Sequence, residues 1–174
     1  VLLAGPSSSG KTSTSKRLAV QLMTCMKVPV ALSMDNWFVD REETPLDEFG
    51  EKDFEYIHAL DLHLFNSDIK KLISVKEIKL PKFNFHTGKK EYNGETMRLN
   101  NDAILIIEGI HALNPMLTEE LDEDSKYRIF AAPIRPIGIT DSEHISNDES
   151  RLIRRVSRDS QTRNRTAQET IQKW

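Results

Sequence analysis

The run that directly follows an apolar N-terminus has the residue types that bind phosphate. Residues 5–12 read G-P-S-S-S-G-K-T and fit the pattern G-x-x-x-x-G-K-[ST] without a mismatch. Glycines allow the backbone to wrap an anion with its N–H groups inward, and the following helix presents its positive end to that anion. Lys11 would reach the β- and γ-phosphates, and the Thr12 hydroxyl would ligate Mg²⁺. The residues predicted to hold a nucleoside triphosphate are Gly5, Pro6, Ser7, Ser8, Ser9, Gly10, Lys11, Thr12 and Ser13.

An acidic residue at the end of a second apolar run would complete such a site. Residues 103–107 are continuously apolar, as in a central parallel strand buried on both faces, and Glu108 follows directly. Ligands of α/β sheets bind at the carboxyl ends of the strands. Glu108 is therefore predicted to hold Mg²⁺ with Thr12, directly or through water. The alternative is a surface acid at a strand end.

A further carboxylate, Asp35, follows a short apolar stretch at 30–34. Phosphoryl transfer to a hydroxyl needs a carboxylate near the attacking oxygen. If 30–34 is a parallel strand, Asp35 lies at the same edge of the sheet as the phosphate loop. An aspartate that caps a turn is equally common at such a place, so the spacing leaves both interpretations open.

Arginines gather near the end of the sequence. Those between 151 and 158 recur at i, i+3, i+4 and i+7 and would form one stripe of a helix. Guanidinium groups bind phosphate oxygens well and would neutralise the charge of a phosphoryl group in transfer. The alternatives are a solvated basic face paired with acidic neighbours and, less favoured, a nucleic-acid-binding stripe. The arginines in this region are Arg151, Arg154, Arg155, Arg158, Arg163 and Arg165.

The order of predicted elements favours an α/β fold with a parallel sheet. Apolar runs predict strands at 1–4, 30–34, 103–107 and 127–131. Helical periodicity predicts helices at 11–26, 60–73, 148–160 and 166–174. The buried face of the first helix would comprise Leu18, Ala19, Leu22, Met23 and Met26. Loops are predicted at 35–51 and at 132–147, the latter with Pro133 and Pro136. The predicted fold class is thus a P-loop NTPase-type parallel sheet flanked by helices, with a small β-hairpin excursion at about 77–99 and a helical lid at about 148–174.

Composition excludes several other classes of protein. The 174 residues carry 24 Lys and Arg against 27 Asp and Glu, and this net charge of −3 argues against a basic nucleic-acid coat. The single cysteine, Cys25, excludes an internal disulfide framework and a cysteine-rich zinc site and favours a reducing, cytoplasmic setting. We expect its thiol to be buried. The longest apolar runs are far shorter than the roughly 20 residues that span a bilayer. The length suits one domain, 1–174, and a start without Met, as if inside a strand, indicates part of a longer chain.

Four stretches together resemble the uridine kinase group of the phosphoribulokinase/uridine kinase family. They are the phosphate loop, L-S-M-D at 32–35, I-I-E-G-I-H-A-L at 106–113 and R-L-I-R-R-V-S-R-D at 151–159, in the family's order over nearly the whole chain. The region 146–174 is most similar to the subgroup in which such a kinase follows an N-terminal domain related to threonyl-tRNA synthetase.

The resemblance implies an enzyme that moves the γ-phosphate of ATP, with Mg²⁺, to the 5′-hydroxyl of a uridine- or cytidine-like nucleoside. It implies that Asp35 is the general base and Glu108 the Mg²⁺-associated acid. The arginine helix would be a lid in which Arg155 and Arg158 act in catalysis with Lys11, while Arg163 binds ATP. The residues implied to bind the acceptor are Asp35, Phe54, Glu55, Phe83, Phe85, His86 and Arg151.

The acceptor side departs from the family's pattern. Glu55 stands for Asp, Phe83 for Tyr and Asn84 for Asp. A base-contacting His of the family aligns with Gly88, and only a shifted register gives that role to His86. Changed hydrogen bonding changes discrimination between substrates, so the identity of the acceptor stays open. The aromatic residues of this hairpin could also be plain core.

Two alternative functions follow from these departures. One is a kinase of the same family for another small hydroxyl metabolite. The other is a non-catalytic ATP-binding regulatory domain, although a pure sensor would not need Asp35. The expected partner is a small-molecule nucleoside, while a homo-oligomer remains open and neither nucleic acid nor a membrane is expected.

Overall fold

A four-stranded parallel sheet in the order β2-β7-β1-β8 forms the centre of the computed structural model. This confirms the predicted α/β class. The structure describes residues 1–119, 121–132, 137–138, 140, 144–163 and 165–174. The strands of the sheet are β1 (Leu2–Ala4), β2 (Val28–Ser33), β7 (Ala103–Glu108) and β8 (Arg128–Phe130).

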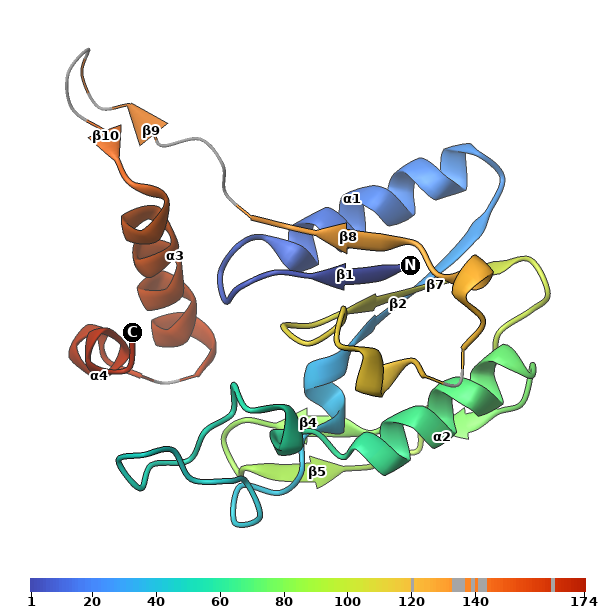
Figure 1. Cartoon of the computed structure of the whole chain (residues 1–174), viewed down its shortest axis with the longest axis horizontal. Helices are drawn as coiled ribbons and strands as arrows, with labels where there is room; N and C mark the ends of the chain where they lie inside the picture. Colours follow the sequence, from blue (N-terminus) through green and yellow to red (C-terminus); the bar gives the residue numbers. More distant parts are fainter. Residues whose placement is uncertain (120, 133–136, 139, 141–143, 164) are drawn as a thin grey trace.

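Helices flank the sheet on both sides. In Figure 1, α1 (Lys11–Thr24) and α2 (Leu62–Ile73) lie on opposite sides of the strands. Two further helices, α3 (Asn147–Thr162) and α4 (Ala167–Gln172), stand beyond the carboxyl end of β1 and pack against each other. Both helices begin with a capping box, which satisfies free backbone N–H groups of the first turn.

The core lies mainly between the sheet and α2. The helix starts at Asp61, whose carboxylate accepts a hydrogen bond from the Leu64 N–H at 3.0 Å. One face of the helix is fully buried, and its Phe65 ring packs edge-on against Trp37. Trp37 belongs to a short 3₁₀ turn, Met34–Trp37, that opens the segment predicted as a loop. The apolar periodicity of 60–73 therefore predicted this helix correctly.

The predicted burial around α1 is wrong in part. Within this helix only Ser15 is buried, while Met23 is 54% exposed. Met26 lies beyond the helix with φ +61° and is 90% exposed. Cys25 is exposed as well. The helix ends at Thr24 and β2 begins at Val28, so Met26 lies in the turn between them and not on a helix face.

The segment between α2 and β7 forms two short antiparallel ladders. In the first, β3 (Ile78–Lys79) pairs with β6 (Thr96–Met97). In the second, β4 (Lys82–Asn84) pairs with β5 (Lys89–Glu91). Both ladders fall within the excursion expected at 77–99.

The region predicted as a loop at 132–147 contains paired strands where it is described. There, β9 (Ile137–Gly138) pairs with β10 (His144–Ile145) in antiparallel register. Pro133 and Pro136 lie outside the described residues. None of the helices in the described parts of the chain combines the length and apolar character needed to cross a bilayer.

Candidate active site

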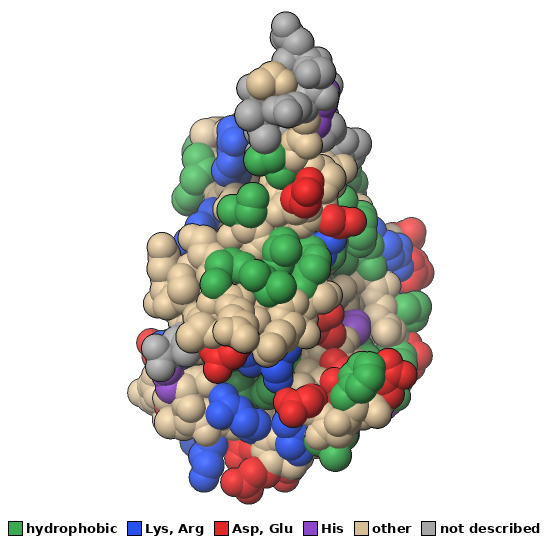
Figure 2. Space-filling model, turned by 90° about the vertical axis from the view of Figure 1, so that its left-hand side faces the viewer, with side chains coloured by type: hydrophobic (Ala, Val, Ile, Leu, Met, Phe, Trp, Pro, Cys, Tyr) green, Lys and Arg blue, Asp and Glu red, His purple; other side chains and the backbone are tan. Residues whose placement is uncertain are grey.

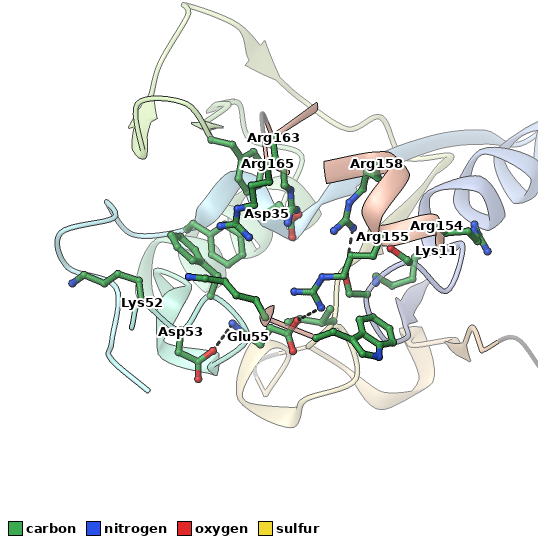
Figure 3. Close-up of a pocket in the computed structure, with 18 of the residues that line it drawn as sticks. Lys11, Asp35, Lys52, Asp53, Glu55, Arg154, Arg155, Arg158, Arg163 and Arg165 are labelled. Atoms are coloured by element: carbon green, nitrogen blue, oxygen red, sulfur yellow. Dashed lines mark hydrogen bonds and ion pairs between the residues drawn. The ribbon is translucent and has the colours of Figure 1, made fainter. Parts of the chain in front are cut away.

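The register of the sheet brings three strand ends together. Ser33 of β2 and Leu3 of β1 both pair with Glu108, the last residue of β7. The phosphate loop follows β1 and Asp35 follows β2, so both leave the sheet at the same edge. A cavity of about 890 Å³ opens there, bounded by the phosphate loop, α3, α4 and the segment that follows β2. Figure 3 shows side chains from these elements turned toward one space.

The phosphate loop is held in place by close approach to a neighbouring strand. A Cβ at Gly5 would lie 2.1 Å from the carbonyl oxygen of Ala131, so only glycine fits. Gly10 has φ +100° and is the N-cap of α1. Because glycine has no side chain, this N-cap leaves the backbone N–H groups of the first turn uncapped. The loop therefore has the local geometry that its sequence predicts.

Lys11 folds back over the phosphate loop. Its Nζ donates to the carbonyl oxygens of Gly5 at 2.8 Å and Pro6 at 3.1 Å. Burial lowers the pKa of Lys11 below its usual value, and the carboxylates of Glu108 and Asp35 oppose that shift. An anion in the loop would offer this ammonium group a stronger partner than two neutral carbonyls.

Thr12 and Glu108 meet at the floor of the cavity. The Thr12 hydroxyl donates to Oε1 of Glu108 at 2.9 Å, and Glu108 is only 8% exposed. Burial raises the pKa of Glu108, and the nearby Asp35 raises it further. A buried carboxylate beside a hydroxyl offers the hard oxygen ligands that Mg²⁺ prefers, and a cation would relieve the cost of burying the charge. In the described part of the chain, no group of three or more His, Cys, Asp or Glu side chains is arranged to hold a metal. Mg²⁺ bound here would thus need phosphate and water as further ligands.

Asp35 lines the cavity from the 3₁₀ turn after β2. Close-up views place it beneath Arg163 and Arg165 (Figure 3). Asp35 lies close enough to Lys11 that its negative charge opposes the lowering of the Lys11 pKa. Its carboxylate is thus available to a group bound in the cavity.

A buried aspartate organises the arginines of α3. Asp159 has no exposed surface, and its Oδ1 accepts from Nε and Nη2 of Arg158 at 2.9 and 2.8 Å. Nε of Arg163 lies 3.8 Å from the same oxygen, and Nε of Arg155 lies 3.9 Å from Oδ2. The predicted pairing of the stripe with acidic neighbours is therefore present at Asp159, and it fixes arginines that line the cavity instead of forming a solvated face.

The arginine helix also contacts the phosphate loop and the opposite wall. Arg151 donates to the carbonyl oxygen of Ser7 and Arg158 to the Ser7 hydroxyl, both at 3.3 Å. Arg155 forms an ion pair with Glu55 across the cavity. The guanidinium of Arg151 also stacks on Trp174, 4.8 Å from the ring centroid. Figure 2 shows this end of the molecule, where basic and acidic side chains lie intermixed in the lower half of the view.

Aromatic side chains form one end of the cavity. Phe38, Phe54 and Phe85 line it, and the ring of Phe38 packs edge-to-face on Phe54, Phe85 and Phe83. Phe83 is 4% exposed and belongs to the buried core, where its ring packs edge-on against Phe85, which lines the cavity. His86 is exposed in the turn after β4 and does not line the cavity.

The structure thus gathers most of the predicted site residues. Lys11, Thr12, Asp35, Glu55 and Glu108 line the cavity, as do the predicted arginines other than Arg151. Sequence reasoning missed further lining residues because they lie in a polar segment without periodicity. That segment follows Asp35 directly and is rich in charged residues. These two features were the signal in the sequence from which its lining residues could have been found. The residues missed in this segment include Phe38, Arg41, Asp47, Lys52 and Asp53, and Trp174 was missed at the end of the sequence.

Comparison with known proteins agrees with this geometry. The model of the phosphoribulokinase/uridine kinase family matches residues 1–135, which include the phosphate loop, Asp35 and Glu108. The chain belongs to this family. Among its relatives, a uridine kinase of Deinococcus deserti is 27% identical over 172 residues, covering 99% of this chain and 73% of that protein. A uridine kinase of Mycoplasma genitalium is 28% identical over 176 residues, covering 100% and 72%.

A solved structure supports the fold of the family. The protein described as a possible uridine kinase from Bacillus stearothermophilus superimposes with a TM-score of 0.59 at 21% identity. The match covers 74% of this chain and 67% of that one.

Proposed function

We propose that this chain transfers the γ-phosphate of ATP to the 5′-hydroxyl of a nucleoside, uridine- or cytidine-like. The observation that carries the proposal is a single cavity that joins a phosphate loop, an available carboxylate at Asp35 and an aromatic end. The relatives at 27% and 28% identity are named uridine kinases, and this supports the same reaction class.

The phosphate end of the cavity would bind the donor. Backbone N–H groups of the loop and the Lys11 ammonium hold the triphosphate. The negative charge that spreads over the transferring phosphoryl group would be neutralised by Arg155, Arg158 and Arg163. The buried Asp159 would keep these arginines in position before ATP binds. Thr12 and Glu108 would hold Mg²⁺, which would supply positive charge against the phosphate oxygens.

Asp35 would act on the acceptor. It orients the 5′-hydroxyl and accepts its proton as the oxygen attacks the γ-phosphorus. Phe38, Phe54 and Phe85 would give a flat ring an apolar wall, and Glu55, which lines the same cavity, would accept hydrogen bonds from the sugar hydroxyls. The helices α3 and α4 act as the lid that keeps water from the reacting phosphate.

The resemblance of 146–174 to the subgroup with a threonyl-tRNA synthetase-related domain stays a prediction. Detection of that domain in the complete protein would test it. Within the range 1–174 we propose one kinase domain.

The decisive experiment measures ADP release from Mg·ATP with a panel of pyrimidine and purine nucleosides, using the complete protein. We expect acceptor-dependent turnover, and we expect Asp35→Asn to lower kcat by about 100-fold or more because a general base contributes roughly that factor. The KM for ATP should change little. Asp102→Asn, at an exposed position before β7, is the matched control.

Other outcomes identify the alternative functions. If nucleosides are inert and another small alcohol is phosphorylated, the acceptor end has been assigned to the wrong class. ATP binding without transfer to any acceptor would favour the regulatory domain. An Asp35→Asn enzyme with normal kcat would remove the general base from the proposal.

A further inference from the structure

Arg41 is tied to the turn between β4 and β5 at two points. Its Nη2 donates to the carbonyl oxygen of Phe85 at 2.6 Å, and its backbone N–H donates to the carbonyl oxygen of Gly88 at 2.7 Å. Arg41 lines the cavity at the end where Phe38 and Phe85 pack edge-to-face. These contacts hold the long, flexible side chain of Arg41 at the aromatic end of the cavity. Arg41 is distant from the phosphate loop in the sequence.

Gly88 makes room for this arginine. It has φ +71°, and a Cβ there would lie 2.8 Å from both Cβ and Nε of Arg41. Any other residue would have to displace the Arg41 side chain as well as adopt a left-handed backbone. Gly88 is also the position at which the resemblance places a base-contacting histidine. The arginine fills the space that a side chain at 88 would take.

The guanidinium keeps unused donors. It carries five N–H donors and no acceptor, and its hydrogen bond to Phe85 uses one of them. Among the described residues, no carboxylate forms an ion pair with Arg41. By contrast, the neighbouring Lys52 donates to the carbonyl oxygens of Glu42 and Thr44. Arg41 is thus placed to donate to a ligand in the cavity.

We propose that Arg41 reads the edge of the acceptor's base and selects nucleosides that present two neighbouring hydrogen-bond acceptors. O2 and N3 of cytosine form such a pair, and so do O6 and N7 of guanine. Uracil has an N3–H donor between its carbonyls, so a donor-only guanidinium meets a donor there. The inference rests on the proposed nucleoside kinase function and narrows its substrate class to cytidine or guanosine in preference to uridine.

The chemistry also predicts how the preference changes. A glutamine amide presents a donor beside an acceptor, which match O4 and N3–H of uracil and, with the amide rotated, N3 and N4–H of cytosine, so it does not discriminate against uridine as a guanidinium does. Arg41→Gln should therefore lower kcat/KM for cytidine or guanosine and raise the relative value for uridine. We expect the ratio of the preferred nucleoside to uridine to fall about ten- to a hundred-fold, the range for loss of one bidentate arginine contact to a base.

The test compares kcat/KM for cytidine, guanosine, uridine and adenosine in the wild-type protein, Arg41→Gln and Arg41→Lys. Lysine keeps the charge but loses the planar fork, so it should lose the preference without gaining one for uridine. Arg98→Gln is the control, because Arg98 is an exposed arginine that donates to the carbonyl oxygen of Val75 outside the cavity. The KM for ATP and the thermal midpoint report whether each variant folds.

The outcomes separate this inference from the function on which it rests. A cytidine preference that Arg41→Gln abolishes supports the pyrimidine edge, and a guanosine preference that the same variant abolishes supports the purine edge. Equal use of cytidine and uridine, or a ratio unchanged in Arg41→Gln, overturns the role of Arg41 and leaves the nucleoside kinase intact. If no nucleoside is phosphorylated by the wild-type protein, the proposed function fails and this inference fails with it.

Discussion

Nη1 of Arg155 lies 3.3 Å from Oε1 of Glu55, so one ion pair joins α3 to the segment that follows β2 across the cavity. The two side chains differ in exposure, 12% for Arg155 and 63% for Glu55. The backbone carbonyl of Glu55 also lies 2.7 Å from Nε2 of His111. An ion pair with one solvent-exposed partner contributes little to the free energy of unfolding. The pair with Glu55 therefore orients Arg155 without holding the two sides of the cavity rigidly together.

Glu55→Gln should therefore affect the acceptor more than the fold. We expect the KM for the nucleoside to rise several-fold, because a carboxylate beside the sugar is lost, while the free energy of unfolding changes by less than about 1 kcal/mol. Glu123→Gln removes an acid that pairs with Lys126 and Arg128 away from the cavity and serves as control. Steady-state kinetics and urea unfolding give both values. A large loss of stability in Glu55→Gln would contradict the interpretation.

Asp159→Asn should affect the lid and the fold together. Without the carboxylate, Arg155, Arg158 and Arg163 lose their common partner and repel one another. Breaking a buried pair costs about 3–5 kcal/mol, and we expect about 2 kcal/mol here because Arg158 stays partly hydrated. The KM for ATP should rise, and added Mg·ATP should restore part of the lost stability because phosphate replaces the missing anion. Urea unfolding with and without Mg·ATP tests this, and an unchanged KM for ATP would exclude a positioning role for Asp159.

The raised pKa of Glu108 makes stability depend on pH. The Glu108 carboxyl binds its proton more tightly in the folded state than in the unfolded state. The protonated carboxyl therefore contributes fully to the free energy of unfolding below its usual pKa of 4.5, and this contribution is lost as pH rises through the folded-state pKa. Glu108→Gln removes the titrating carboxyl and with it this loss of stability at higher pH. Without ligand, the variant should melt at a higher temperature than the wild type near neutral pH, and the difference should shrink toward zero as pH falls to about 4.5.

Mg·ATP should reverse that order at neutral pH. It should stabilise the wild type and have a much smaller effect on Glu108→Gln, since the amide cannot replace a carboxylate near the metal. Glu95→Gln, at an exposed position of the excursion, is the control. If the melting temperatures of Glu108→Gln and the wild type differed by the same amount at every pH in this range, the proposed role of Glu108 would be contradicted.

Gly5→Ala tests the close approach behind the phosphate loop. The added Cβ would lie 2.1 Å from the Ala131 carbonyl oxygen and 2.7 Å from Oγ of Ser9, so the loop must move. We expect the KM for ATP to rise about tenfold or more, since a shift of the loop amides weakens a site built from backbone groups. Gly94→Ala is the contrasting variant. Gly94 has φ +80° and open space around it, so alanine should cost about 1–2 kcal/mol of stability and leave the KM for ATP unchanged.

Local patterns predicted the parts of the site that are local in the chain. The phosphate loop and the strand that ends at Glu108 follow from residues adjacent in sequence. The helix at 60–73 follows from apolar periodicity, because one face packs on the core along its whole length. Asp35 was left open on spacing alone, since its neighbours become known only through the pairing of β2 with β7.

The remaining features depend on contacts between distant segments. No pattern links Arg41 to Gly88, because their contact arises where the segment after β2 meets a turn 47 residues later. Alternation identified Phe83 and Phe85 as a pair but could not say which of them faces the cavity. The apolar face predicted for α1 failed for a similar reason, since burial depends on what lies opposite and not on periodicity alone.

The pairing of β2 with β7 runs residue for residue from Val28 and Ala103 to Ser33 and Glu108. Deleting one residue from either strand would turn every following side chain to the other face and separate Asp35 from Glu108. The segments at 39–56 and 77–99 carry no such restriction, because they leave the sheet and return to it as loops and short ladders. Evolution can thus lengthen or replace the parts that we propose to contact the acceptor, while the spacing of the proposed phosphate-binding residues stays constant. Engineering of new acceptors should start from insertions in those two segments.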